Sequence, residues 1–289
     1  MGYTDIPAVF VDTGLEYPEI REFIRTFDNV VWLKPRMQFR KVIETYGYPF
    51  ISKEVSEAVE GARIYLQKGT YQDAYQKLNG LGVFAKGGKR ELYAQTKWGF
   101  LIDAPFKVSK QCCNVMKKGA THNYSNKEKR VGITAQMAEE SMLRTNKWLE
   151  NGCNGFRLKN PISNPMSFWT EQDVLQYIKQ NGITIASVYG NIVYDESASE
   201  QLEGQLEFVH DGIEEAKGVL KTTGCKRTGC MFCGFGCHLE KEGEGRFEKM
   251  KETHPKQYEW IMRDWDKGGL GYKKVIDWIN ENGHLNIRY

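Results

Sequence analysis

The feature that most constrains this chain is a cysteine-rich stretch at residues 224–238, which reads Gly-Cys-Lys-Arg-Thr-Gly-Cys-Met-Phe-Cys-Gly-Phe-Gly-Cys-His. Four of the chain's seven cysteines lie in these fifteen residues. Cys230 and Cys233 form a CxxC pair, a spacing that lets two thiolates from one tight turn bind a single metal centre. The glycines of the stretch remove Cβ atoms where the backbone must wrap closely around a bulky inorganic ion.

Other cysteines widen the candidate site. An adjacent pair, Cys112 and Cys113, lies well upstream, Cys225 and Cys237 flank the CxxC, and Cys153 stands alone. Thiolate-rich sites select zinc or iron–sulfur clusters over hard cations. Three interpretations are therefore open: an iron–sulfur cluster, a structural zinc, or a redox dithiol or buried cysteines without a cofactor.

The ligand set also has alternatives. If a metal binds, the two cysteines of the CxxC pair are the first candidates for its ligands. Cys112, Cys113 and Cys225 compete for the remaining two places, and Cys237 is the least favoured candidate.

Composition limits the class of protein. The 289 residues are enough for one substantial core, and 40 basic against 37 acidic residues describe a mixed surface that says little about nucleic acid. No run of eighteen apolar residues exists, so we expect no membrane span. An odd number of cysteines behind an N-terminus without a signal peptide predicts reduced thiols and a cytoplasmic protein.

An apolar run near the N-terminus, Ile6–Val11, predicts a short buried strand that ends at Asp12, Thr13 and Gly14. Ligands of open α/β sheets bind at the carboxyl ends of strands. These three residues are thus predicted to hold a ribose or adenine. The alternative is that the acid and the hydroxyl cap the following predicted helix, Pro18–Phe27.

The next segments continue the pattern. Residues 30–33 predict a strand and residues 39–46 a helix, so strand and helix alternate as in βαβ units. The fold class is therefore predicted to be α/β, with a parallel sheet flanked by helices. Residues 49–105 show helical periodicity over 52–67 and 71–78, then a glycine- and lysine-rich stretch, and are interpreted as a helical insertion with a mobile loop.

A second strand end is predicted after residues 129–134, where a turn and helix follow over 138–144. Glu140, Ser141 and Arg144 are candidate nucleotide-binding residues, because the planar guanidinium suits phosphate or sulfate. The alternative is an ordinary helical ion pair between Glu140 and Arg144 at i, i+4 spacing.

The chain is expected to form two regions. Residues 1–210 would make the nucleotide-binding α/β domain, and residues 211–289 a cysteine-rich, helical C-terminal region packed on it. Within the latter, residues 246–265 predict one amphipathic helix and residues 272–280 a last short helix.

These pieces, in this order, resemble the phosphoadenosine phosphosulfate reductase family of the adenine nucleotide α-hydrolase-like superfamily, over roughly residues 6–237. The matching residues are Val9 through Gly14 with Tyr17-Pro18-Glu19, Cys112-Cys113, Gly132 with Glu140-Ser141 and Arg144, Pro165 through Ile178, and Gly229 through Cys233. The resemblance implies a Rossmann-like sheet and, as in the iron–sulfur branch, a [4Fe–4S] cluster held by the adjacent pair and the CxxC near the sulfonucleotide. The cysteine motif with Cys225 is also similar to that of DndC-type proteins of DNA phosphorothioation.

The resemblance implies an adenine nucleotide or sulfonucleotide as ligand, with sulfonucleotide reduction or ATP-dependent sulfur transfer as the activity. Lys110, Lys117 and Arg227 would meet anionic groups, and a thioredoxin-like protein would donate electrons. The alternative is a non-catalytic or partner-dependent iron–sulfur subunit of a DNA-modification or defence complex, with nucleic acid as a partner. A homodimer, or assembly with a partner subunit, is compatible with both functions.

Two family features are not matched. The phosphate loop Ser-Gly-Gly-Lys-Asp-Ser is not found before the first predicted strand, so the chain is shortened, another chain supplies the loop, or no triphosphate is handled. The C-terminal Glu-Cys-Gly-Leu-His motif with its nucleophilic cysteine is also not found. Cys237 beside His238 is a candidate substitute, since a neighbouring histidine can activate a thiol.

Overall fold

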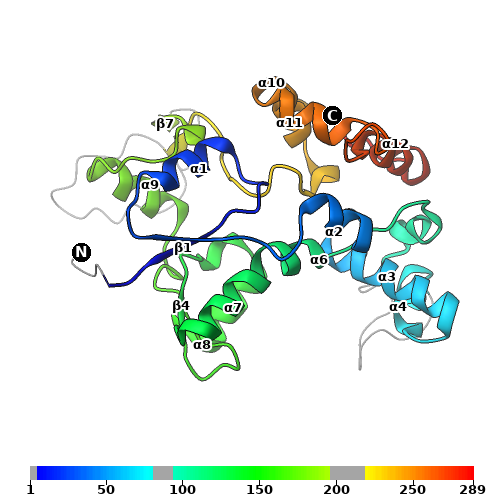
Figure 1. Ribbon diagram of the computed structural model, residues 1–289, viewed down its shortest axis with the longest axis horizontal. Helices are drawn as coiled ribbons and strands as arrows, with labels where there is room; N and C mark the ends of the chain where they lie inside the picture. The colour runs from blue at the N-terminus through cyan, green and yellow to red at the C-terminus, as the bar shows by residue number, and fades with distance from the viewer. Residues whose placement is uncertain (1–4, 81–93, 196–218) are drawn as a thin grey trace, which may run out of the picture. The chain divides into compact units, whose positions relative to one another are not determined.

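The computed structural model describes residues 5–80, 94–195 and 219–289 of the chain (Figure 1). The chain folds into two compact units that are interleaved in sequence, so it passes between them several times. Unit 1 comprises Met1–Phe10, Tyr17–Val31 and His122–Thr228, and unit 2 comprises Val11–Glu16, Trp32–Thr121 and Gly229–Tyr289.

Unit 2 is mainly helical, and its described residues include one short parallel strand pair. Its elements are α2 (Phe39–Tyr46), β3 (Phe50–Ile51), α3 (Lys53–Lys68), α4 (Gln72–Leu78), η1 (Thr96–Asp103), α6 (Gln111–Cys113), η2 (Asn114–Lys118), β9 (Gly234–Phe235), η6 (Cys237–Leu239), α10 (Arg246–Thr253), α11 (Pro255–Met262) and α12 (Tyr272–Gly283). The chain crosses from unit 2 to unit 1 within α7 (Gly119–Glu128).

Unit 1 holds most of the remaining strands. Its elements are α1 (Pro18–Arg25), β4 (Gly132–Ile133), η3 (Ala138–Glu140), α8 (Met142–Asn151), β5 (Asn154–Gly155), β6 (Ile162–Ser163), α9 (Glu171–Gln180), η4 (Ser187–Tyr189), β7 (Ile192–Asp195) and β8 (Val219–Thr222). Strands β1 (Ala8–Val11) and β2 (Val30–Leu33) each run from unit 1 into unit 2.

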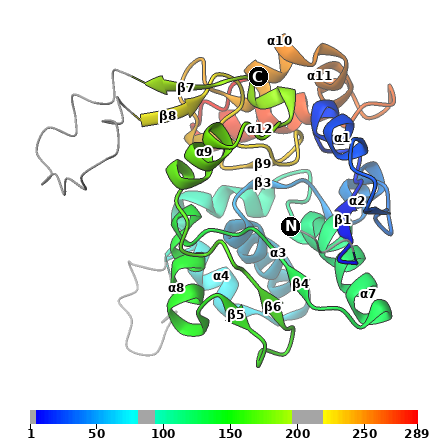
Figure 2. The same ribbon diagram turned by 90° about the vertical axis from the view of Figure 1, so that its left-hand side faces the viewer.

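The predicted α/β class is confirmed, and its strands pair in small sheets (Figure 2). Strands β1 and β2 are joined by bonds from the Ala8 nitrogen to the Asn29 carbonyl and from the Asp12 nitrogen to the Leu33 carbonyl, at a constant sequence offset, so they run parallel. Strands β3 and β9 are also parallel. The third sheet has the order β4-β6-β5, and β7 pairs antiparallel with β8. Among the described residues these four small sheets replace one continuous sheet.

Several predicted elements have the predicted bounds, and others are corrected. The strand at residues 30–33 and the helix at residues 39–46 are confirmed. The first strand is less buried than expected, with Val9 39% exposed. The predicted strand at residues 129–134 contains only the two residues of β4. The predicted mobile loop lies largely outside the described residues.

The predicted single helix at residues 246–265 is wrong, because it is two helices. Helix α10 ends at Thr253 and α11 begins at Pro255. The proline ring has no N–H and disfavours helical backbone in the residue before it, and His254 accordingly has φ −136° and ψ 60°. Pro255 then occupies the first turn of α11, where proline is tolerated.

The units divide the chain differently from the predicted regions. Unit 2 joins much of the predicted insertion at residues 49–105 to the C-terminal helices, whereas the predicted boundary at residue 210 follows sequence order. The predicted division into 1–210 and 211–289 stays a prediction.

The core of unit 2 is built around Tyr272, the first residue of α12, which is fully buried. Its ring lies 5.2 Å from that of Phe50 in β3, 5.5 Å from that of Tyr48 and 6.0 Å from that of Phe247 in α10. The hydroxyl donates a 2.7 Å hydrogen bond to the carbonyl of Phe232. The aromatic core therefore reaches the backbone of the cysteine-rich segment.

Tyr272→Phe should destabilise the protein, because it removes this buried hydroxyl and leaves the Phe232 carbonyl without its donor. A buried polar group left unsatisfied costs about 1–3 kcal/mol. We expect a loss in this range in the free energy of unfolding, measured by urea denaturation. Tyr71→Phe is the matched control, because Tyr71 is 65% exposed. Equal stability of the two variants would contradict the anchoring role.

Candidate metal centre

The CxxC pair lies in a tight turn of unit 2. The Cys233 nitrogen donates to the Cys230 carbonyl at 3.1 Å, which closes the turn. Two bonds hold the intervening residues: the Met231 nitrogen donates to the Leu15 carbonyl at 2.8 Å, and Tyr272 donates to Phe232. Because Met231 and Phe232 are themselves buried, the turn is fixed from inside the core.

Strand β9 continues directly from the turn. Gly234 pairs with Phe50 and Phe235 with Ile51 in the parallel β3–β9 ladder. A Cβ on Gly234 would lie 2.5 Å from the Phe50 ring, so this position requires glycine. Gly236 has φ +82°, a conformation that favours glycine, and its nitrogen donates to the Ile51 carbonyl. The glycines after the CxxC thus serve backbone packing.

Arg246, at the start of α10, is a residue that the sequence analysis missed. Its Nη1 donates to the Cys233 carbonyl at 2.6 Å, and its Nε pairs with Glu240 Oε1 at 2.5 Å. The guanidinium therefore places a positive charge next to the CxxC turn. Burial raises the pKa of Cys233, and this positive charge opposes the rise without cancelling it. No local motif identifies Arg246, because it lies thirteen residues beyond the carbonyl that it binds.

The adjacent pair Cys112–Cys113 forms the end of the short helix α6, and the π-helical segment η2 follows it. The Ser109 hydroxyl accepts a hydrogen bond from the Gln111 nitrogen at the start of α6. Helix α6 packs against α2, and Cys112 is buried. A π-helical turn is an uncommon local geometry that occurs often at functional sites.

The two cysteine pairs lie within electrostatic range of one another in unit 2. Burial raises the pKa of Cys112 far above its ordinary value, and Cys113, Cys230 and Cys233 raise it further. Burial raises the pKa of Cys230 to about 11, while Lys117 works in the opposite direction. Thiols this close oppose one another's ionisation, and a positive centre among them would relieve that repulsion.

Lys117, on η2, connects the thiols to the segment after β1. Its Nζ lies 3.1 Å from Glu16 Oε1, and it is hydrogen-bonded to Cys230. Burial works against this cation, but Cys230 and Glu16 outweigh it and raise the pKa of Lys117. The buried Glu16 carboxylate in turn accepts from the Thr13 hydroxyl at 2.7 Å and from the Thr13 nitrogen at 3.1 Å.

Glu16 is a second residue that the sequence analysis missed. The sequence did contain a signal for Glu16. Thr13 and Glu16 have the spacing of a hydroxyl residue followed three positions later by an acid, which is typical of a side-chain hydrogen bond. The alternative prediction had Asp12 and Thr13 cap α1, but the N-cap of that helix is Tyr17, and the Thr13 hydroxyl donates to Glu16. Asp12 instead accepts from the Gly14 nitrogen at 3.3 Å.

The predicted residues thus fall into two groups. Unit 2 contains the four cysteines of the two pairs together with Asp12, Thr13 and Gly14, whereas unit 1 contains the other candidates. Those in unit 1 are Glu140, Ser141, Arg144 and Cys225.

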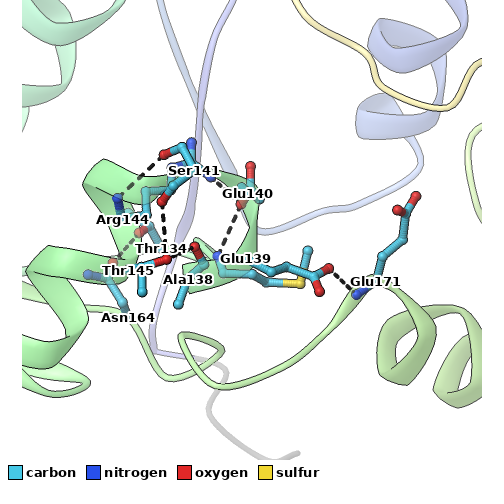
Figure 3. A network of polar contacts seen from close by, with 10 residues as sticks. Thr134, Ala138, Glu139, Glu140, Ser141, Arg144, Thr145, Asn164 and Glu171 are labelled. Atoms are coloured by element: carbon cyan, nitrogen blue, oxygen red, sulfur yellow. Dashed lines mark hydrogen bonds and ion pairs between the residues drawn. The ribbon is translucent and has the colours of Figure 1, made fainter. Parts of the chain in front are cut away.

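In unit 1, the predicted anion-binding residues form a local network at the start of α8 (Figure 3). Arg144 forms an ion pair with Glu140, as the alternative prediction had it, and Glu140 also accepts from the Met137 nitrogen at 3.0 Å. Ser141 is the N-cap of α8 and accepts from the Arg144 nitrogen. An anion at Arg144 would have to compete with the Glu140 carboxylate.

The remaining cysteines have separate settings. The backbone nitrogen of Cys225 donates a 2.9 Å hydrogen bond to the Val188 carbonyl, and the Cys225 carbonyl accepts one from the Thr222 hydroxyl. Cys153 is partly exposed in unit 1. Cys237, in unit 2, is 3% exposed, and burial raises the pKa of its thiol to about 12. A neutral, buried thiol is a poor nucleophile, which argues against Cys237 as the substitute catalytic cysteine.

Over residues 5–80, 94–195 and 219–289, no three histidine, cysteine, aspartate or glutamate side chains come together in a geometry that would hold one metal ion. The donor set of the two cysteine pairs consists of thiols alone, and that chemistry fits zinc or an iron–sulfur cluster. In the same described ranges, no helix has the length and apolar character needed to cross a membrane.

Comparison with known proteins gives the class. Residues 82–234 match the phosphoadenosine phosphosulfate reductase domain. This match covers more than half of the chain, and the chain therefore belongs to that family. Family membership indicates a sulfonucleotide-related function, with nucleotide binding in sulfur metabolism. The matched segment includes both cysteine pairs and lies after Asp12–Gly14. No curated protein matches the chain significantly.

The inertness of Cys237 can be tested by alkylation of the metal-free protein with iodoacetamide at pH 8. With a pKa of about 12, roughly one Cys237 thiol in 10⁴ would be ionised at that pH. Mass spectrometry should show that Cys237 is labelled far more slowly than the partly exposed Cys153. Labelling of both at similar rates would restore Cys237 as a candidate nucleophile.

Proposed function

We propose that this protein is a phosphoadenosine phosphosulfate reductase-like iron–sulfur protein that binds an adenine sulfonucleotide and acts in sulfonucleotide reduction or ATP-dependent sulfur transfer. In this proposal Cys112, Cys113, Cys230 and Cys233 hold a [4Fe–4S] cluster, and zinc is the alternative metal. Cys225 is not needed for four ligands.

The observation that carries the proposal is the shared setting of the two cysteine pairs. They are more than a hundred residues apart in sequence, yet both lie in unit 2 and influence one another's ionisation. One pair lies in a turn fixed by the core, and the other lies on a helix that packs against α2. A core without a cofactor would gain little from gathering four thiols whose ionised forms repel one another.

Two cations support an anionic centre at this place. Lys117 is hydrogen-bonded to Cys230, and Arg246 binds the carbonyl of Cys233. When bound, a cluster would supply electron storage or a local charge. The protein's own part is to hold the thiols and to offset their negative charge with these two side chains.

The nucleotide would lie in reach of the segment after β1. Thr13 belongs to the same unit as the four cysteines and is linked to Lys117 through Glu16. Lys117 is 40% exposed on its side chain, so it can meet an anionic group of a ligand while it holds Glu16. Lys110 already pairs with Glu57, which makes it the weaker candidate for this role.

The metal assignment can be tested by anaerobic purification followed by iron, acid-labile sulfide and zinc analysis. We expect iron and sulfide in equal amounts, and visible absorbance that is lost when any one of Cys112, Cys113, Cys230 or Cys233 is changed to serine. Cys153→Ser and Cys225→Ser are controls that should keep the absorbance. Zinc without labile sulfide would overturn the cluster, and loss of iron in Cys225→Ser would change the ligand set.

Nucleotide binding can be tested by calorimetry with adenosine phosphosulfates and with ATP. We expect Lys117→Met to weaken sulfonucleotide binding about tenfold or more, since a charge-assisted contact contributes about 1.5–3 kcal/mol. Lys118→Met removes the same charge one residue later on an exposed side chain and should bind as the wild type does. Binding of the sulfonucleotide but not ATP favours reduction, and ATP hydrolysis favours sulfur transfer. Binding of neither ligand would overturn the proposal.

A further inference from the structure

The three-stranded sheet of unit 1 has an exposed end that the proposed function does not use. In its register Gly132, Ile162 and Gly155 lie side by side, and so do Ile133, Ser163 and Asn154. Residues paired across strands present their side chains on the same face. The hydrogen bond from the Ser163 hydroxyl to Asn154 Oδ1, at 2.7 Å, fits this arrangement.

Three exposed apolar residues lie in β4 or directly next to the strands β4 and β5. Ile133 is the last residue of β4, and Val131 lies two residues before it. Val131 comes directly before β4 and Phe156 directly after β5, so both residues lie at the end of the sheet where β6 begins. Val131, Ile133 and Phe156 are 48%, 59% and 58% exposed. Water therefore covers a patch that contains an aromatic ring.

The loop between β5 and β6 is ordered by its own contacts. The Leu158 nitrogen donates to the Gly155 carbonyl at 3.3 Å, which makes a turn with Phe156 and Arg157 at its two central positions. Leu158 folds back against Gly155, where a Cβ would lie 2.6 Å from its Cδ1. Figure 2 shows this hairpin beside β4. The ring of Phe156 and the guanidinium of Arg157 are thus presented at the tip of a defined turn.

Four cations lie along the same end of the sheet. Lys129 and Arg130 precede Val131, and Arg157 and Lys159 follow Phe156. Residues 129–136 and 154–163 contain no acidic residue. Within the part of the chain that the structure describes, none of the four forms an ion pair, and the side chain of Arg130 makes a long 3.5 Å bond to the Asp5 carbonyl.

We propose that this exposed end of the sheet of unit 1, with Val131, Ile133 and Phe156 and these four cations, binds single-stranded nucleic acid. Exposed aromatic rings on a sheet stack on unpaired bases, and flanking lysines and arginines contact the phosphates. A protein partner would be expected to place charges of both signs around the patch, and the two segments carry one sign only. The bases of a duplex are stacked inside it, so a duplex would not use the ring.

The test is fluorescence anisotropy of the full-length protein with labelled twenty-nucleotide single strands of DNA and of RNA, across a salt series. We expect binding that weakens with salt. Arg157→Gln with Lys159→Gln should weaken it at least fivefold and reduce the slope of log K against log salt by about 1.4, as expected for two lost phosphate contacts to a single strand. Lys68→Gln with Lys256→Gln removes the same charge from unit 2 and should bind as the wild type does.

Substitutions of Phe156 separate stacking from general apolar docking. Phe156→Leu should weaken single-strand binding about tenfold, since base stacking contributes about 1–3 kcal/mol per base, and Phe156→Tyr should restore it. Equal binding by the leucine and tyrosine variants would overturn the proposal. A wild-type dissociation constant weaker than about 10⁻⁴ M, or equal affinity for duplex, would also overturn it. So would cross-linking of this surface to a protein partner and not to nucleic acid.

The proposal does not depend on the metal centre. The variants of Arg157, Lys159 and Phe156 should keep the wild-type iron content and sulfonucleotide affinity, with unchanged thermal unfolding. A failure of cluster or nucleotide binding in the wild type therefore leaves this surface testable, and a failure here leaves the proposed function untouched.

Discussion

The candidate metal centre depends on one constraint, the burial of Tyr272 beneath the CxxC turn. Its ring packs against Tyr48, Phe50 and Phe247, and its hydroxyl donates a hydrogen bond to the Phe232 carbonyl. A phenol in such a core needs a polar partner. The partner that it finds is the carbonyl of Phe232, between two metal-ligand candidates, so the core of α10 and α12 holds the backbone of the CxxC turn. The parallel β3–β9 ladder then fixes the segment that follows.

Charge explains the rest of the centre. Buried thiols resist ionisation, and the pKa values of Cys112, Cys230 and Cys233 are all raised, with burial as the largest cause. Lys117 and Arg246 oppose that effect without removing it. In the proposed function, burial keeps these thiols neutral until a positive centre binds, and the free energy of that binding would add to the stability of unit 2.

The two units divide the predicted functions between them. Unit 2 carries the cysteine pairs and the segment after β1, and unit 1 carries the network of Glu140, Ser141 and Arg144. That network is satisfied internally, since the arginine pairs with Glu140 and the serine caps α8. The exposed end of the sheet around Phe156 lies in the same unit and has no such internal partners among the described residues. The side chains of unit 1 that are free to bind a ligand therefore lie at its sheet rather than at the N-terminus of α8.

Sequence reasoning succeeded where the signal is local. The bounds of β2 and α2 and the Glu140–Arg144 pair follow from neighbours within a few residues. The single helix predicted over residues 246–265 was wrong, although Pro255 is a local signal for the helix break. Sequence reasoning also missed Glu16 and Arg246, because their partners Lys117 and Cys233 lie 101 and 13 residues away.

The sequence by itself determined the family, the thiol chemistry and the close turn of the CxxC, because spacing along a chain limits which side chains can meet in one turn. Only the tertiary structure decided that Cys112 and Cys113 share a unit with that turn while Cys225 does not. It also decided that Cys237 is buried and that Lys117 bridges a thiol and a carboxylate. Burial and long-range contacts are properties of the packed core, and no local pattern carries them.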